Sequence, residues 1–530
     1  WILMNANHKQ QPQLIRSLLM PDVYDHPATE IQLIETHISW VILTGDFAYK
    51  IKKPVDLGFL DFSTLEKRAF CCNEELRLNS RLAAPIYREV VPLTGTAAEP
   101  VLRGEGEIIE YAIKMVQFPQ SAQLDNMLAS GELEKHHMDA FARRVAAFHA
   151  DADVAGNDSD YGDPSHVFRP VAENFTQIRQ HLQTSKYDDR LAELESWSKA
   201  GFDSLRALFE QRKRDGCIRE CHGDMHLRNL VWFNDEPLAF DCLEFNADLR
   251  WIDTLSEIAF LVMDLQDRKQ PVLAQRFLNS YLEHSGDYRG LRVFRFYLVY
   301  RALVRAKVVA IRAGQPGLSE KEQQEADHEF RAYLALAGST MRHEPPRLLI
   351  TRGMSASGKS TLTQPLLELM GAVRIRSDIE RKRMFGIDPD TDSSAGIEQG
   401  IYSAAAGKKT YQRLALLAES VLAAGYDVIV DAAFLKYEQR QLFSRLADTL
   451  QIPFIIVEFS ASADTLRQRI RARQGDVSDA DLSVLEHQLA TAKPLHDDEM
   501  NSLIRVDTEQ AFDAQQLYQQ IKALSRENNV

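Results

Sequence analysis

The sequence predicts two domains in one chain: a two-lobed α+β domain, followed by an α/β domain with a parallel sheet. The first half opens with short alternating segments around one helix and continues as mostly helix. From residue 347 on, short apolar runs alternate with helical segments, an order typical of a parallel sheet with helices on both faces. The stretch 338–346, Gly-Ser-Thr-Met-Arg-His-Glu-Pro-Pro, is expected to be the linker between them.

The first domain is expected to consist of a small N-lobe and a helical C-lobe. Residues 37–43 and 47–53 alternate in hydrophobicity on either side of Thr44-Gly45-Asp46, which predicts a β-hairpin. A helix follows over 63–82, where apolar side chains fall on one face, and further strands are expected at 90–91 and 107–116. The boundaries we expect are about 35–117 for the N-lobe, about 118–315 for the C-lobe and 1–340 for the whole domain.

The second domain, placed at 341–530, is expected to alternate between strands and helices. The predicted strands are 347–351, 373–376, 427–430 and 453–459. The predicted helices are 359–370, 408–424, 436–449 and a long one from 463.

Composition excludes some classes of function. The net charge of −14 disfavours broad binding to nucleic acids or anionic membranes. We find no apolar stretch of 18 residues, and therefore expect no transmembrane helix. The beginning of the sequence lacks the basic-then-apolar pattern of a secretion signal. The five cysteines form no CxxC pair, which favours reduced thiols and a cytoplasmic protein.

A first group of polar residues has the pattern of a phosphoryl-transfer site. The segment 222–229 reads His-Gly-Asp-Met-His-Leu-Arg-Asn, and Asp241 follows at the end of an apolar strand. Such a site needs a carboxylate beside the incoming hydroxyl and oxygen ligands for Mg²⁺. Asp224 is the candidate base, and Asn229 and Asp241 are candidate metal ligands.

The 222–229 segment and Asp241 resemble those of the aminoglycoside phosphotransferase family, which includes small-molecule kinases, and the resemblance covers about 35–315. It implies a protein-kinase-like fold, ATP as phosphate donor, Asp224 as catalytic base, and Asn229 and Asp241 as magnesium ligands. Asp253 is expected to brace the loop that carries the base.

The same resemblance implies an N-lobe lysine paired with a helix glutamate at the nucleotide. Lys50 and Lys52 lie on one face of the second predicted strand, so either one suits the role. Glu75 borders the apolar face of the 63–82 helix, which makes it the expected partner.

A second phosphate-binding pattern begins after the strand 347–351. Residues 353–360 read Gly-Met-Ser-Ala-Ser-Gly-Lys-Ser, the spacing of a P-loop between a strand and a helix. Its backbone N–H groups wrap phosphate oxygens, its lysine reaches the β- and γ-phosphates, and its last serine binds Mg²⁺. The predicted nucleotide-binding residues here are Gly353, Ser355, Ser357, Gly358, Lys359, Ser360 and Thr361.

Charged residues beyond the P-loop resemble those of small P-loop kinases: gluconate-kinase-like enzymes, the 5′-kinase of polynucleotide kinase and zeta-toxin-like kinases. The resemblance covers about 347–500. It implies Asp378 as base, Arg381 on the acceptor, and Arg469 and Arg473 as lid arginines on the phosphates. Asp431, at the end of an apolar strand, is a candidate metal ligand. Asp378 is expected across the P-loop from Ser360, because the strands that precede these two residues are predicted to be neighbours.

Together these patterns predict a bifunctional ATP- and Mg²⁺-dependent kinase whose two acceptors are small hydroxylated metabolites. Two alternatives stay open for the second half: a kinase for nucleic-acid ends, which the charge balance disfavours but does not exclude, or a nucleotide sensor that regulates the first half. No membrane partner is expected. The sequence leaves open the identity of the acceptors, the choice between ATP and GTP, the oligomeric state, and which of Lys50 and Lys52 contacts phosphate.

Overall fold

The computed structural model describes residues 11–58, 60–182, 184–315, 318–342, 344–387, 403–472 and 482–527. The chain forms two compact units. Unit 1 comprises Trp1–Arg144, Phe148–Pro170 and Phe209–Asp264, and unit 2 comprises Val145–Ala147, Val171–Leu208 and Leu265–Val530. Unit 2 therefore joins several helices of the expected C-lobe to the P-loop region. None of the helices described here combines the length and the apolar character needed to cross a bilayer.

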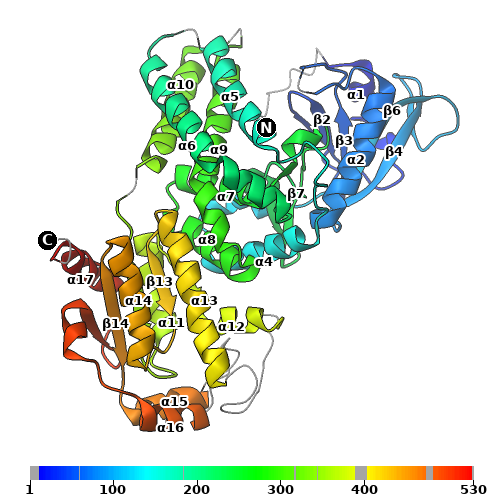
Figure 1. Ribbon diagram of the computed structural model, residues 1–530. Helices are drawn as coiled ribbons and strands as arrows, with labels where there is room; N and C mark the ends of the chain where they lie inside the picture. Colours follow the sequence, from blue (N-terminus) through cyan, green and yellow to red (C-terminus); the bar gives the residue numbers. More distant parts are fainter. Residues whose placement is uncertain are drawn as a thin grey trace. The chain divides into compact units, whose positions relative to one another are not determined.

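Unit 1 begins with an antiparallel sheet of strand order β1-β2-β3-β6-β4-β5 (Figure 1). The strands are β1 Gln32–Glu35, β2 Ser39–Leu43, β3 Phe47–Lys52, β4 Tyr87–Gly95, β5 Pro100–Leu102 and β6 Ile108–Val116. The helix α2, Leu65–Ala83, packs against β4 and β6. The Thr64 hydroxyl accepts a hydrogen bond from the Lys67 N–H and so caps α2. This confirms the expected hairpin-plus-helix N-lobe.

Two short antiparallel pairs lie in the rest of unit 1. One pair joins β7, Ile218–Glu220, to β10, Trp251–Asp253, and the other joins β8, Leu230–Phe233, to β9, Glu236–Ala239. Between β7 and β8 runs the 221–229 loop, and α7, Thr254–Asp267, follows β10 directly. The core residues Val231 and Leu238 pack with Cys72 of α2 and Ile113 of β6. These contacts fix the 221–229 loop relative to the N-lobe sheet.

The other helices before the P-loop region are mostly long. In chain order they are α1 Gln13–Ser17, α3 Leu124–Ser130, α4 Lys135–Asp151, α5 Pro164–His181, α6 Asp188–Arg214, α8 Pro271–Ser285, α9 Leu291–Ala313 and α10 Glu320–Thr340. Helices α9 and α10 pack along each other in unit 2. The linker expected at 338–346 is wrong at its start, because α10 continues through Gly338 to Thr340. A Cβ atom on Gly338 would lie 1.3 Å from Nη2 of Arg190, so the glycine lets a neighbouring side chain pass close to the helix.

The P-loop region of unit 2 is built on a parallel sheet of strand order β12-β13-β11-β14-β15. These strands are β11 Leu348–Arg352, β12 Val373–Arg376, β13 Val428–Asp431, β14 Phe454–Ser460 and β15 Leu503–Asp507. The helices are α11 Lys359–Met370, α12 Ser377–Met384, α13 Ala404–Ala423, α14 Tyr437–Leu450, α15 Ala463–Ala472, α16 Leu482–Thr491 and α17 Ala514–Glu527.

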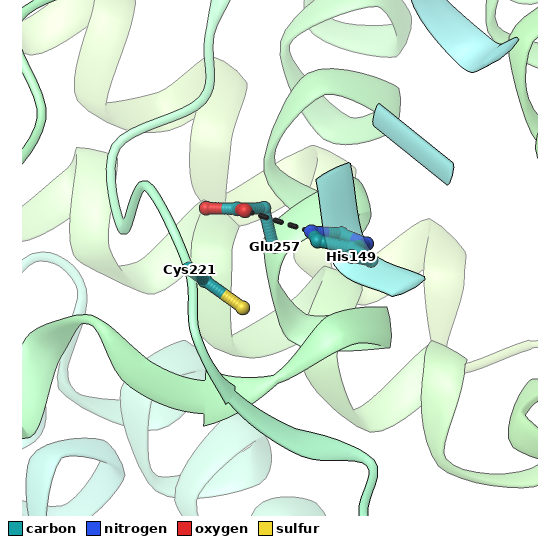
Figure 2. Close-up of side chains that lie close together, drawn as sticks. All are labelled: His149, Cys221 and Glu257. Atoms are coloured by element: carbon teal, nitrogen blue, oxygen red, sulfur yellow. Dashed lines mark hydrogen bonds and ion pairs between the residues drawn. The ribbon is translucent and has the colours of Figure 1, made fainter. Parts of the chain in front are cut away.

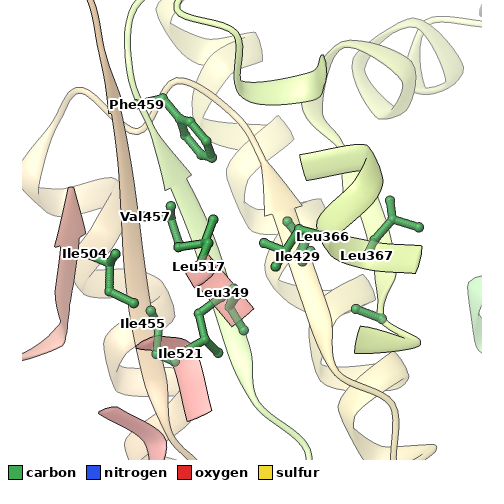
Figure 3. Close-up of a cluster of buried hydrophobic side chains, with 11 residues drawn as sticks. Leu349, Leu366, Leu367, Ile429, Ile455, Val457, Phe459, Ile504, Leu517 and Ile521 are labelled. Carbon is green, nitrogen blue, oxygen red and sulfur yellow. The ribbon is translucent and has the colours of Figure 1, made fainter. Parts of the chain in front are cut away.

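One face of this sheet is covered by α11 and α17. Figure 3 shows Leu349, Ile429 and Ile455 on the strands, with Leu366 of α11 and Ile521 of α17 among the buried side chains around them. The all-parallel α/β fold expected from the sequence is therefore confirmed. The strand order differs from one expectation: β13 lies between β11 and β12, so the strands before Ser360 and Asp378 are not neighbours.

Candidate active sites

The 221–229 loop brings the first two predicted site residues into contact. The side-chain amide of Asn229 donates from Nδ2 to Oδ2 of Asp224 and to its backbone oxygen, both at 2.9 Å. His226 lies beside them, with Nε2 at 3.4 Å from Oδ2 of Asp224. Asn229 is buried and Asp224 only partly so, which leaves the carboxylate on the solvent side of the loop. Asp224 and Asn229, five residues apart in the sequence, are therefore in direct contact in the structure.

Glu257 of α7 lies close to Cys221, where the loop begins, and to His149 (Figure 2). Its Oε1 accepts a hydrogen bond from the Gly223 N–H at 2.6 Å, and its Oε2 accepts from the His222 N–H at 3.1 Å. His149 Nε2 donates to the same Oε2 at 2.9 Å. Burial opposes ionisation of Glu257, but the hydrogen bond and charge of His149 and the loop N–H groups outweigh it and lower its pKa to about 2.

His149 and Glu257 form a group with Cys221 that is compact enough for a metal ion. However, both oxygens of Glu257 already accept N–H hydrogen bonds, and the Cys221 thiol lies 3.6 Å from the Ile252 carbonyl oxygen. The group is thus explained as a brace of the loop. Asp253, also expected to brace the loop, forms a buried ion pair with Arg212 at 2.6 Å.

Glu75 joins both candidate lysines of the N-lobe. It is fully buried on α2, with Oε1 at 2.7 Å from Lys50 Nζ and Oε2 at 2.6 Å from Lys52 Nζ. Lys50 Nζ also lies 2.5 Å from Oδ1 of Asp241, whereas Lys52 pairs with the buried Glu244. Burial opposes the charge of Lys50, yet Asp241 and Glu75 raise its pKa above the ordinary value.

Asp241 has an unusual backbone conformation for a residue with a side chain. Its φ of 63° lies in the left-handed region, which costs free energy unless the surroundings enforce it. Its N–H donates to the Tyr87 hydroxyl at 3.3 Å, and that hydroxyl donates to Oε1 of Glu75 at 3.4 Å. Tyr87 therefore links the metal-ligand candidate to the lysine–glutamate pair. The sequence of β4 did not indicate that Tyr87 links these residues, because a tyrosine at the end of a strand is usually interpreted as a core residue.

The P-loop begins after β11 and has the backbone that its sequence requires. A Cβ atom on Gly353 would lie 2.5 Å from the Phe459 carbonyl oxygen, and Gly358 has a φ of 85° where α11 begins. Lys359 Nζ donates to the carbonyl oxygens of Gly353 and Met354 at 2.9 and 2.8 Å. The lysine thus folds back over its own loop, as phosphate binding demands.

The other predicted P-loop residues occupy the loop and the first turn of α11. Ser357 is buried, Ser355 and Ser360 are partly exposed, and Thr361 is exposed. The N–H of Ser355 donates to Oε1 of Gln488 on α16 at 2.7 Å, a contact that sequence did not indicate. Backbone N–H groups of this loop are therefore within reach of side chains from α16.

Of the two lid arginines, Arg469 lies against the P-loop. Its guanidinium donates from Nη2 to the backbone oxygen of Thr508 at 2.7 Å and from Nη1 to the Ala356 oxygen at 3.4 Å. Arg473 falls outside the described residues. Only Arg469 can therefore be placed beside the phosphate-binding loop.

Asp431 ends β13, the strand next to β11, and it is 5% exposed. Its Oδ1 lies 3.4 Å from the Thr351 hydroxyl, while Oδ2 is buried and finds no hydrogen-bond partner among the residues that the structure describes. A buried carboxylate oxygen without a partner is costly, and a bound cation or its water would satisfy it. The oxygen donors of Asp431 and of the P-loop residue Ser360 are of the kind that Mg²⁺ prefers.

Asp378 and Arg381 lie together on α12, one turn apart. Oδ1 of Asp378 is 3.4 Å from Nη1 of Arg381, and both side chains are partly exposed. Arg383, a possible competitor for Asp378, instead pairs with Glu380. The strand before α12 is separated from the P-loop strand by β13, so Asp378 follows a strand that is one position further from the P-loop than expected.

Comparison with known families matches both halves. A model described as "Phosphotransferase enzyme family" matches residues 117–294, which contain the 221–229 loop, and one described as "AAA domain" matches 348–495, which contain the P-loop. The chain is therefore a kinase: a fusion of an aminoglycoside phosphotransferase-like domain with a P-loop kinase domain.

One full-length relative defines the family more closely. The "Uncharacterized protein Rv2004c" of Mycobacterium tuberculosis is 33% identical over 461 residues, which cover 86% of this chain and 89% of the relative. A protein of Mycobacterium bovis, Mb2027c, matches equally. This chain belongs to the same two-domain family as these mycobacterial proteins.

Several solved kinase structures are similar to part of this chain. The amicoumacin kinase hAmiN, in complex with AMP-PNP, Ca²⁺ and Ami, is 11% identical and covers 63% of this chain and 96% of its own, with a TM-score of 0.40. A sugar kinase from Janibacter sp. HTCC2649 is 22% identical and covers 35% of this chain and 99% of its own, with a TM-score of 0.28.

Proposed function

We propose that this protein is a bifunctional kinase in which each domain transfers the γ-phosphate of ATP to a hydroxyl group of a small metabolite. The observation that supports the proposal is that each half contains its own group of residues suited to handle phosphate. One set joins Lys50, Glu75 and Asp241 by contacts of 2.5 to 2.7 Å. The other is the P-loop, with Lys359 folded over it and Asp431 at the neighbouring strand end.

In the N-terminal domain, Asp224 is the proposed base. It accepts the proton of the acceptor hydroxyl while that oxygen bonds to the γ-phosphorus and the bond to the β–γ bridging oxygen breaks, releasing ADP. Its hydrogen bond from Asn229 and the brace of Glu257 fix the position of its carboxylate. Lys50 is the better candidate for contacting phosphate, because it lies at Asp241, whereas Lys52 is held by Glu244.

In the C-terminal domain, Asp378 is the proposed base and Arg381 the proposed acceptor contact. The P-loop residues hold the phosphates, and Arg469 and Arg473 are proposed to neutralise charge on the transferring group. Arg469 has support from its contact with Ala356 of the P-loop. Arg473 rests on the sequence pattern alone.

Magnesium fits both sites by donor chemistry, since carboxylate, amide and hydroxyl oxygens are its preferred protein ligands. Asn229 and Asp241 would hold it in the N-terminal domain, and Ser360 and Asp431 in the C-terminal domain. When bound, Mg²⁺ supplies positive charge that offsets the charge on the phosphate oxygens. We place the reaction in the cytoplasm, where ATP is abundant.

The experiment that tests the proposal is a phosphorylation screen of metabolite extracts with γ-labelled ATP. Intact protein should label two groups of products. The Asp224→Asn variant should lose one group and the Asp378→Ala variant the other. If the C-terminal domain labels nucleic-acid ends, and this labelling falls steeply as the salt concentration rises, its acceptor is a nucleic acid and not a small metabolite. Absence of any C-terminal product, with nucleotide still bound there, would favour the sensor alternative.

A further inference from the structure

The edge strand of the P-loop sheet is completed by α8, a helix of the same compact unit that comes earlier in the chain. In the part of the chain that the structure describes, β12 is the outermost strand on its side, so its outer N–H and C=O groups have no strand partner there. Asn279 of α8 takes that place: its Oδ1 accepts from the Arg374 N–H at 2.8 Å, and its Nδ2 donates to the Ala372 oxygen at 3.1 Å. Gln275, one turn earlier on α8, donates to the same oxygen at 2.6 Å. Asn279 is 3% exposed, so these are buried hydrogen bonds.

A buried arginine carries this contact from α8 to the P-loop helix. Arg374 of β12 is 6% exposed. Its Nη2 and Nε donate to Oε1 of Glu283 on α8 at 3.0 and 3.2 Å, and its Nη1 donates to the backbone oxygen of Ser360 at 3.0 Å. Ser360 lies in the first turn of α11, next to Lys359. A single guanidinium thus spans from the carboxylate of α8 to the beginning of the P-loop helix.

The end of α8 is also attached to α12, which carries the candidate base. The Arg383 guanidinium donates to the carbonyl oxygens of Glu283 and His284 in the last turn of α8. A cation at this position is favourable, because the carboxyl end of a helix carries partial negative charge. A Cβ atom on Gly286, which follows α8, would lie 2.7 Å from Nε of Arg383, so the glycine admits the guanidinium. Arg383 in turn pairs with the fully buried Glu380 on α12.

We propose that α8 is a working part of the P-loop site, and that Glu283 is a positioning residue that acts through Arg374 on the first turn of α11. The geometry gives the mechanism: the Glu283 carboxylate fixes the plane of the guanidinium, which holds the Ser360 backbone, and so sets how the P-loop meets phosphate. The inference rests on nucleotide binding by the P-loop. It does not require that the C-terminal domain transfer phosphate, so the two proposals fail separately.

The test is equilibrium titration of the full-length protein with MgATP, where the P-loop site is the one lost in Lys359→Ala. In Glu283→Gln the pair with Arg374 loses its charge, and the P-loop affinity should fall about tenfold while the N-terminal site keeps its affinity. Arg374→Lys should also weaken nucleotide binding at the P-loop site. The forked guanidinium of arginine contacts Glu283 and Ser360 at the same time, whereas the single ammonium group of lysine cannot reach both. Glu283→Asp, which keeps the charge, should recover part of the affinity.

The matched control is Glu329→Gln. Glu329 of α10 pairs with Arg312 of α9 at 2.6 Å, a helix-to-helix ion pair in the same unit that does not involve β12. This variant should leave both nucleotide affinities unchanged. Hydrogen exchange of residues 359–364 gives a second readout and should be faster in Glu283→Gln only. Wild-type P-loop affinity together with wild-type exchange in Glu283→Gln would overturn the inference. An equal loss of affinity in Glu329→Gln would also overturn it, because the effect would then be general destabilisation.

Discussion

Replacing Glu257 by glutamine should loosen the 221–229 loop and lower the N-terminal activity. The carboxylate accepts hydrogen bonds from two loop N–H groups and from His149. An amide offers one oxygen in place of two and puts an NH₂ group against a donor. Hydrogen bonds to a buried charge contribute about 1.5–3 kcal/mol each. We therefore expect a loss of roughly 3 kcal/mol in the free energy of opening this loop, and a fall of about 10- to 100-fold in transfer, because small displacements of a base are costly.

The pH dependence supplies an independent estimate. The pKa of Glu257 falls from an ordinary 4.5 to about 2 on folding. A group with a lowered folded-state pKa stabilises the protein above its unfolded-state pKa and loses that contribution as the pH falls through the folded-state value. The stabilisation, about 3 kcal/mol by this linkage, should be complete at pH 6–7 and should disappear between about pH 4.5 and 2. The glutamine variant should lack this acid-dependent portion.

Hydrogen exchange of the His222 and Gly223 amides measures the loop opening directly, and transfer to an N-terminal product measures the consequence. A suitable control is Glu89→Gln, which removes an exposed ion pair with Arg103 in the same unit and should cost under about 1 kcal/mol. If Glu257→Gln leaves the exchange of both loop amides at wild-type rates, as Glu89→Gln should, the brace has no energetic role and the reasoning is refuted.

Three further substitutions test individual side chains. Lys50→Ala should abolish most N-terminal transfer in a protein that still folds. Lys52→Ala should mainly lower thermal stability, because it removes the lysine from the buried Glu244 while Glu75 keeps Lys50; equal loss of transfer at equal stability would contradict this division. Gly353→Ala should remove nucleotide from the P-loop, since its Cβ would meet the Phe459 oxygen at 2.5 Å; wild-type affinity would show that the loop adapts. Asp378→Ala should keep P-loop nucleotide affinity and lose transfer to the acceptor, and retained transfer would exclude Asp378 as the base.

Much of the N-terminal site was predictable because it depends on local spacing. Lys50 and Lys52 are two residues apart on one strand and therefore lie on the same face, and both side chains pair with Glu75. The loop brace was missed, although a signal existed. Glu257 lies at the start of a strongly apolar helix, where an acidic residue is buried only if it is paired. Asp253 was predicted for this role because its segment resembles the one that follows the metal ligand in the aminoglycoside phosphotransferase family; in the structure it pairs with Arg212, which comes from a distant helix.

What the sequence did not determine was mainly long-range arrangement. Consecutive strands often pair, and this tendency suggested that β11 and β12 were neighbours. The strand β13, which is more than 50 residues further along the chain, lies between them instead. Similarly, Gly338 was interpreted as the start of a linker, since glycine often ends helices. In the structure, a glycine is needed at position 338 because the Arg190 side chain passes close to the helix there. A contact between such distant positions leaves no signal in the local sequence.

The central claim is that two independent kinase sites share this chain, and equilibrium titration of the intact protein with MgATP tests it most directly. The account predicts two nucleotide sites per chain. Lys359→Ala, which removes the lysine folded over the P-loop, should leave one of them, and Lys50→Ala should weaken the other. A single nucleotide site that disappears completely with Lys359→Ala would contradict the claim, because the N-terminal domain would then bind no nucleotide of its own.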